Sequence, residues 1–246
     1  MSRLTDAGDA RWFRFLSRWS LVAGLMALAL FLAFSIAILP ASQNSSLPAE
    51  YSELVAATHS PTLYRLAITL DVAVWLGLGG FFLALAAIFA RRAPIRAMFL
   101  LACGLGMVVG VVGAYARLVG TTDLAARYVT APAAEQASLL RSYLDLRLTI
   151  GANFGAGALL WSTALLLAAS VAWSMAEFPR WLAVGLGLPG IIMLPKQVLE
   201  LVTGVDLGAF FFPAFILLIV VLFAMAGVFW RRAPLGAPNV SSVAAS

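Results

Sequence analysis

The chain has 246 residues, of which 63% are hydrophobic and only 11% are charged, and its mean hydropathy is +0.98. Because soluble domains are about a quarter charged, this composition excludes a soluble protein and predicts one integral membrane domain. The formal net charge of +5 does not indicate nucleic acid as a partner. The basic residues lie mostly between apolar runs, where they orient a membrane protein and contact lipid headgroups.

Residues 1–19 contain the segment DARWFRFLSRWS, which places Trp12, Phe15, Leu16 and Trp19 on one helical face. That pattern favours a short cytoplasmic amphipathic helix in the membrane interface. A basic flank that only orients the first span would need no more than the arginines, and the sequence leaves both interpretations open.

Six segments meet the requirement of about 20 mostly apolar residues for a membrane-crossing helix. They are residues 20–39, 66–90, 97–116, 148–176, 181–202 and 207–230. We therefore predict an all-α fold, a six-transmembrane-helix bundle over residues 20–232. Residues 233–246 are small and polar and predict a flexible cytoplasmic tail.

Two connections on one side of this bundle are longer than linkage requires. In residues 40–65, Pro48, Glu50 and Glu53 favour the start of a short helix that Pro61 ends. In residues 117–147, Pro132 opens a helical pattern that no later proline interrupts before span four. One helix is therefore expected to run from this connection straight through that span.

The distribution of basic residues predicts the orientation. With six spans both termini share a side, which carries ten of the sixteen Lys and Arg residues on shorter connectors. These are Arg3, Arg11, Arg14, Arg18, Arg91, Arg92, Arg96, Arg180, Arg231 and Arg232. The positive-inside rule places both termini in the cytoplasm.

Polar groups inside apolar spans are costly and are the default functional residues of a membrane protein. The candidates for ligand binding or structural ion pairs are Asp71, Arg117, Arg147, Asn153, Lys196 and Glu200. All fall toward the outer side. One interpretation is an outward-facing polar vestibule, with span five broken at Pro189 and Pro195. The other is structural, with Lys196 and Glu200 as an i,i+4 pair and Asp71 paired to Arg65, Arg117 or Arg147.

The glycines of spans three and four recur at small-x-x-x-small spacing, in Gly106-x-x-x-Gly110 and Gly151-x-x-x-Gly155. This spacing lets helix backbones approach closely. We expect packing within the chain, and contact with a partner subunit is the alternative.

The single cysteine, Cys103, excludes an intrachain disulfide, and the single histidine, His59, is too few for a bis-histidine haem or a typical zinc site. His59 is expected to be an exposed loop residue. The alternative is a single axial ligand to a pigment or metal of a larger complex. No cofactor or metal is otherwise predicted.

The segments RLAITLD, residues 65–71, and FPRWLAVGLGLPGI, residues 178–191, together with the six-span plan, resemble a family of bacterial six-helix membrane proteins known only as a domain of unknown function. The resemblance covers most of residues 20–232. It implies a multi-pass protein of the bacterial inner (plasma) membrane and carries no activity with it.

From these features we predict a non-catalytic scaffold or accessory subunit of a larger membrane complex, for example a respiratory or photosynthetic one. Its partners would be membrane lipids and other membrane protein subunits. The alternative is a transporter, or a binder of lipophilic small molecules, that uses the outward-facing vestibule.

Overall fold

The computed structural model describes residues 7–38, 40, 47–203, 207 and 210–232, and the regular structure in them is helical. The elements are α1 (Ala7–Ala37), the 3-10 turn η1 (Ala49–Tyr51), α3 (Ser52–His59), α4 (Pro61–Phe89), α5 (Pro94–Gly106), α6 (Val108–Thr130), α7 (Ala133–Ala172), α8 (Arg180–Thr203) and α9 (Phe211–Arg232). With α5 and α6 counted as one span, six helices are long and apolar enough to cross a membrane. The all-α, six-span prediction is confirmed. The predicted tail at 233–246 lies outside the described residues.

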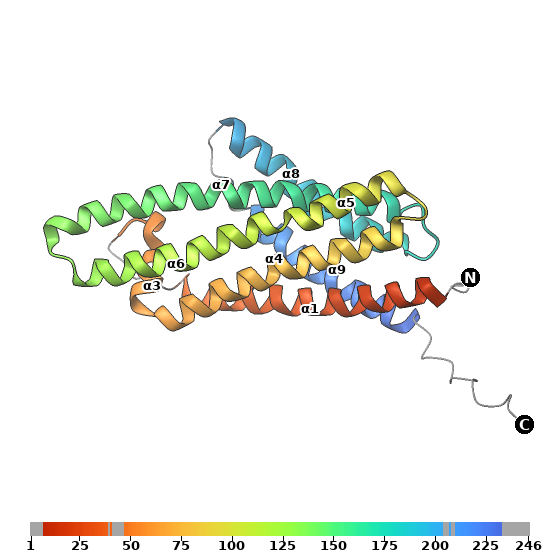
Figure 1. The fold of residues 1–246 in the computed structure, drawn as a ribbon, viewed down its shortest axis with the longest axis horizontal. Helices are drawn as coiled ribbons and strands as arrows, with labels where there is room; N and C mark the ends of the chain where they lie inside the picture. The colour runs from red at the N-terminus through yellow and green to blue at the C-terminus, as the bar shows by residue number, and fades with distance from the viewer. Residues whose placement is uncertain (1–6, 39, 41–46, 204–206, 208–209, 233–246) are drawn as a thin grey trace, which may run out of the picture.

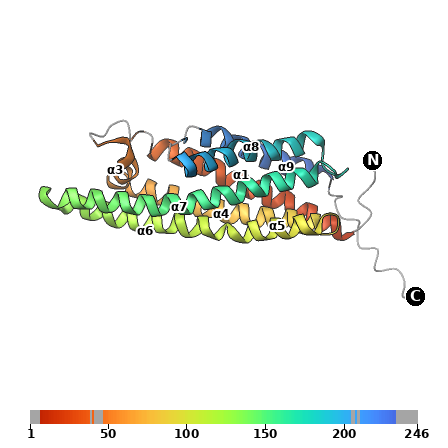
Figure 2. The same ribbon diagram turned by 90° about the horizontal axis from the view of Figure 1, so that it is seen from above.

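The helices form an elongated bundle (Figure 1), and the order of their contacts closes a ring. Along the ring, α4 packs against α1, α1 against α9, α9 against α8, and α8 against α7, while α5 and α6 close it between α7 and α4. The beginning of α1 and the end of α9 lie at one end, here called the terminal end. The turn between α6 and α7 lies at the other, the hairpin end. Figure 2 shows α6 and α7 running side by side toward it.

The second long connection is the main difference from the prediction. Helix α6 continues to Thr130 rather than ending near residue 116, and α7 begins at Ala133. The expected connection is therefore wrong over residues 117–130, because α6 extends through them as a helix and reaches α7 by a tight turn. Arg117, Thr121 and Ala125 are buried at helical spacing on α6, which gives this polar stretch one inward face. The single helix predicted through span four is confirmed as α7, with 40 residues.

The first long connection folds as expected around its prolines. Pro48 precedes η1, α3 ends at His59, and Pro61 is the first residue of α4, where a proline loses no helical hydrogen bond. Helix α3 buries Leu54, Ala56 and Ala57 in a small apolar cluster with residues of α4, α6 and α7. This burial fixes α3 against the hairpin end of the bundle.

The N-terminal segment is continuous with the first span. Helix α1 runs unbroken from Ala7 through Ala37, so the described part of residues 1–19 forms no separate helix. Its Phe13 ring stacks on Phe229 at a centroid distance of 5.0 Å, and Leu16 is fully buried. Trp12 and Phe15 of the same segment stay exposed. The basic stretch therefore extends the bundle and keeps aromatic rings on its outer surface.

At the terminal end, one ion pair joins the turn after α4 to the turn before α8. Arg92 Nη1 donates to Glu177 Oε2 at 2.6 Å, and the Arg92 side chain is 48% exposed. Hydrogen bonding from Arg92 lowers the pKa of Glu177. The folded form therefore holds this carboxylate ionised, and the pair is lost only as the pH falls through that lowered pKa.

The glycines fall into two groups. A Cβ on Gly110 would lie 2.1 Å from the Trp75 ring, and one on Gly106 would lie 2.8 Å from Leu160. Close packing within the chain is thus confirmed for this pair. The prediction of close packing is wrong for Gly151, which has nothing within 4 Å of such a Cβ. It is also wrong for Gly155, whose nearest neighbour is Gln197 Oε1 at 3.6 Å.

We predict that Gly110→Ala destabilises the protein by about 1–3 kcal/mol, because the added methyl group overlaps Trp75. The matched control is Gly227→Ala on α9, where nothing lies within 4 Å and where the helix gains up to about 1 kcal/mol in propensity. Denaturation in a mild detergent, followed by circular dichroism, measures both. Equal stability of the two variants would contradict the packing.

Candidate functional site

A cavity of about 600 Å³ lies inside the ring, toward the hairpin end. Its lining comes from α1, α3, α4, α6, α7, α8 and α9. The charged residues on its wall are Glu53, Asp71, Arg117, Arg147, Lys196 and Glu200. The ring of helices thus gathers charges that are far apart in the sequence around one space.

Five of the six residues predicted from the sequence line this cavity, and Asn153 does not. The Asn153 side chain donates from Nδ2 to the Thr149 carbonyl at 3.2 Å, and it faces Gly113 of α6. His59 is exposed at the end of α3, where its Nδ1 lies 3.0 Å from the Val55 carbonyl oxygen. Neither residue belongs to the charged lining.

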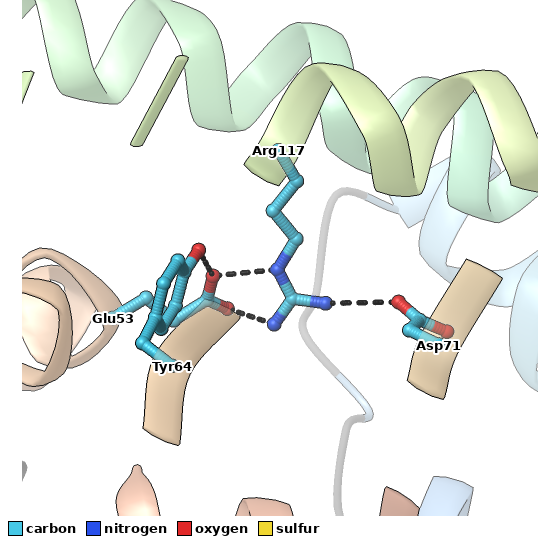
Figure 3. A network of polar contacts seen from close by, with 4 residues as sticks. All are labelled: Glu53, Tyr64, Asp71 and Arg117. Atoms are coloured by element: carbon cyan, nitrogen blue, oxygen red, sulfur yellow. Dashed lines mark hydrogen bonds and ion pairs between the residues drawn. The ribbon is translucent and has the colours of Figure 1, made fainter. Parts of the chain in front are cut away.

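Arg117 is the centre of the most buried polar contacts (Figure 3). Its Nε and Nη2 each donate to one oxygen of Glu53 at 2.6 Å, and its Nη1 donates to Asp71 Oδ2 at 3.3 Å. Tyr64 Oη donates to Glu53 Oε2 at 3.4 Å. All three guanidinium nitrogens are therefore engaged, in the two-pronged geometry that arginine makes with a carboxylate.

Two aromatic rings enclose the same guanidinium. The Arg117 Cζ atom lies 4.9 Å from the centre of the Phe34 ring and 5.6 Å from that of Phe154. Arg117 and Asp71 are only 8% and 6% exposed. The rings exclude water and add cation–π attraction, so the charge is satisfied by the protein alone.

Each member of this group is placed by a short-range feature of the sequence. Tyr64 and Asp71 are seven residues apart on α4, which puts them on one face two turns apart. The polar extension of α6 carries Arg117, and burial of Leu54 in α3 turns the preceding Glu53 inward. Sequence reasoning assigned Glu53 only to a helix start, and missed it as a partner of Arg117.

On α8, Lys196 and Glu200 form the predicted i,i+4 ion pair. Lys196 Nζ donates to Glu200 Oε2 at 2.6 Å, and Glu200 Oε1 accepts the backbone N–H of Leu207 at 2.7 Å. Glu200 thereby ties the end of α8 to the connection before α9. The break of span five that belonged to the vestibule interpretation is not found, because α8 continues through both Pro189 and Pro195. Figure 1 shows the end of α8 rising clear of the α7 ribbon.

Most of the rest of the wall is aromatic and apolar, with Ser52 and Gln197 as polar exceptions. Phe31 of α1 meets Phe212 of α9 edge to face at 6.4 Å, and Phe211 stacks on Phe215 at 5.4 Å. On the other side, Trp75 packs against Phe154 at 5.8 Å. An apolar pocket of this size with a few converging polar groups is typical of a small-molecule site. Among the residues that the structure describes, no group of three or more His, Cys, Asp or Glu could hold a metal ion.

Comparison with known proteins finds no family model, no curated protein and no solved structure that matches this chain. The resemblance to a bacterial six-helix family is thus supported only by the plan of six apolar spans. Fold and site together define the class as a multi-pass helical membrane protein with a charged and aromatic cavity.

We predict that Arg117→Met lowers the free energy of unfolding by roughly 3–5 kcal/mol, because it leaves the buried carboxylate of Asp71 and the partly buried carboxylate of Glu53 without a counter-charge. The control is Arg141→Met at an exposed position of α7, which should change stability by less than about 0.5 kcal/mol. Denaturation in detergent, followed by intrinsic fluorescence, measures the difference. Similar stability of the two variants would show that the ion pairs of Arg117 do not stabilise the fold.

Proposed function

We propose that the protein binds an amphipathic, lipophilic small molecule in the cavity at the hairpin end. The observation that carries this proposal is the cavity itself, which has a volume of about 600 Å³ and both charged and aromatic walls. Ligand pockets in proteins span about 300–1,000 Å³ and combine apolar walls with a few placed polar groups.

Ion pairs within the chain hold two of the cations in the polar lining. Arg117 is fixed by Glu53 and Asp71, and Lys196 by Glu200. A site whose side chains are held in advance loses less conformational entropy when a ligand binds. The buried charged residues of the described chain, Asp71, Arg117 and Lys196, all line this cavity. We therefore favour binding at one side over passage through the bundle, which would need polar groups along the whole path.

The second candidate is the accessory subunit of a larger membrane complex, without catalysis. The closed ion pairs of Arg117 favour it, because they join α3, α4 and α6, and Glu200 ties the end of α8 to Leu207. In that case a partner polypeptide would remain bound after gentle solubilisation, and the cavity would hold nothing specific.

We further propose that the hairpin end faces outward, with both termini in the cytoplasm of a bacterial cell. The arginine-rich turn between α4 and α5 lies with the beginning of α1 and the end of α9 at the terminal end. Dense positive charge at this end is the pattern of a cytoplasmic face.

Native mass spectrometry of the purified protein tests the function. We expect a lipophilic molecule to remain bound to the wild type and to be lost from Gly151→Leu, because Gly151 lines the cavity and has free space around it. Gly227→Leu on α9, also in open space, is the matched control and should keep the molecule. A stable partner polypeptide with no bound small molecule would instead support the accessory subunit.

Cysteine labelling in intact cells tests the orientation. Ala134→Cys at the hairpin end and Ala176→Cys at the terminal end both replace exposed alanines, in a Cys103→Ala background. A membrane-impermeant maleimide should label the first and not the second. Labelling of Ala176→Cys alone would reverse the proposed topology.

A further inference from the structure

The carboxylates on the cavity wall are all engaged by hydrogen-bond donors. Among the carboxylates, Glu53 accepts bonds from Arg117 and Tyr64, Glu200 accepts them from Lys196 and Leu207, and Asp71 accepts one from Arg117. Each carboxylate on the wall therefore has a donor, and the guanidinium of Arg117 has no nitrogen left over.

Two cationic donors on the same wall retain unused capacity. Lys196 can donate three hydrogen bonds, and Glu200 is its one partner in the described chain. Arg147 is exposed, and within the described residues no carboxylate pairs with it. An anionic group in the cavity would therefore meet two cations that can each still donate hydrogen bonds.

The α7 side of the cavity leaves room for such a group. Arg147, Gly151 and Gly155 follow one another at four-residue spacing, which places them on one face of α7. Gly151 has nothing within 4 Å of a built Cβ, and Gly155 has only Gln197 Oε1 at 3.6 Å. These two positions form a strip without side chains that begins one turn after Arg147 on α7 and meets α8 at Gln197, the residue after Lys196.

The opposite side offers an apolar surface. Phe31 of α1 and the phenylalanines of α9, Phe211, Phe212 and Phe215, line the cavity there. A ligand that spans the cavity would meet cationic donors at one end and aromatic rings at the other. That division fits a molecule with a polar head and an apolar chain.

We infer that the ligand of the proposed site is an anionic amphiphile, whose carboxylate or phosphate oxygens lie on the Gly151–Gly155 strip between Arg147 and Lys196. This inference rests on the proposed function and adds the chemical class of the ligand. An ammonium head would instead meet Arg147 and Lys196 as like charges, while the carboxylates are already engaged. The anionic head belongs either to a free fatty acid or to a membrane phospholipid.

Binding of four probes to the delipidated protein in a neutral maltoside detergent tests the inference. The probes are oleate, oleyl alcohol, oleylamine and dioleoyl phosphatidylglycerol, read by melting temperature and by native mass spectrometry. We expect oleate or the phosphatidylglycerol to bind more tightly than the alcohol and the amine. Tight binding of oleate indicates a free fatty acid as the ligand, and tight binding of phosphatidylglycerol indicates a membrane phospholipid.

Two charge variants locate the head. Arg147→Gln should weaken binding of the anionic probe about tenfold or more, the effect expected from losing one charge-assisted hydrogen bond. Binding of oleyl alcohol should stay unchanged. Arg141→Gln, which removes a charge from an exposed position of the same helix, should change neither. Because Lys196→Gln also breaks the pair with Glu200, Lys196→Arg serves beside it and should retain anion binding.

Different outcomes overturn the two proposals separately. Equal binding of oleate and oleyl alcohol, with both blocked by Gly151→Leu, would refute the anionic head and keep the binding site. Tighter binding of oleylamine than of oleate, abolished by Asp71→Asn, would also refute the anionic head and keep the binding site. The polar head of the ligand would then lie beside the carboxylates. If no probe binds, or Gly151→Leu changes no binding, the proposed function itself fails.

Discussion

The placement of one guanidinium, that of Arg117, governs the hairpin end of this protein. Removing a charge from water inside a membrane protein is costly unless partners surround it. Arg117 belongs to α6 and finds its partners on two other elements, since Glu53 belongs to α3 and Asp71 to α4. The rings of Phe34 and Phe154 add α1 and α7. Five elements are thereby held in register around one charge, and the cavity lies beside it.

Trp75 links the packed part of the bundle to the open part. Its ring lies where side chains on Gly110 of α6 and Gly157 of α7 would otherwise be, so α4, α6 and α7 approach closely around it. Trp75 also lines the cavity. Dense packing on one side of the ring thus holds the wall of the cavity in place, while Gly151 and Gly155 keep space free on the other.

Apolar length and helical spacing made much of this structure predictable. The six spans, the long α7 and the Lys196–Glu200 pair all follow from local sequence. The helical extension of α6 does not follow from local sequence, because its polar residues are typical of a loop. Only the tertiary structure buries Arg117, Thr121 and Ala125 on one face of this helix. Asp71 had three arginines within plausible reach, and only the tertiary arrangement selects Arg117. Glycine spacing is equally ambiguous, since Gly106 and Gly110 pack closely while Gly151 and Gly155 line open space.

The central claim is that the ring of helices holds a ligand cavity beside a closed ion-pair group. The most direct measurement is an electron cryomicroscopy structure of the protein in lipid nanodiscs, with a bound antibody fragment to aid alignment. The account predicts non-protein density in the cavity, beside Gly151 and between Arg147 and Lys196, with Arg117 still bonded to Glu53 and Asp71. A bundle in which Trp75 and Phe154 fill this space, and no density remains between α7 and α9, would contradict it.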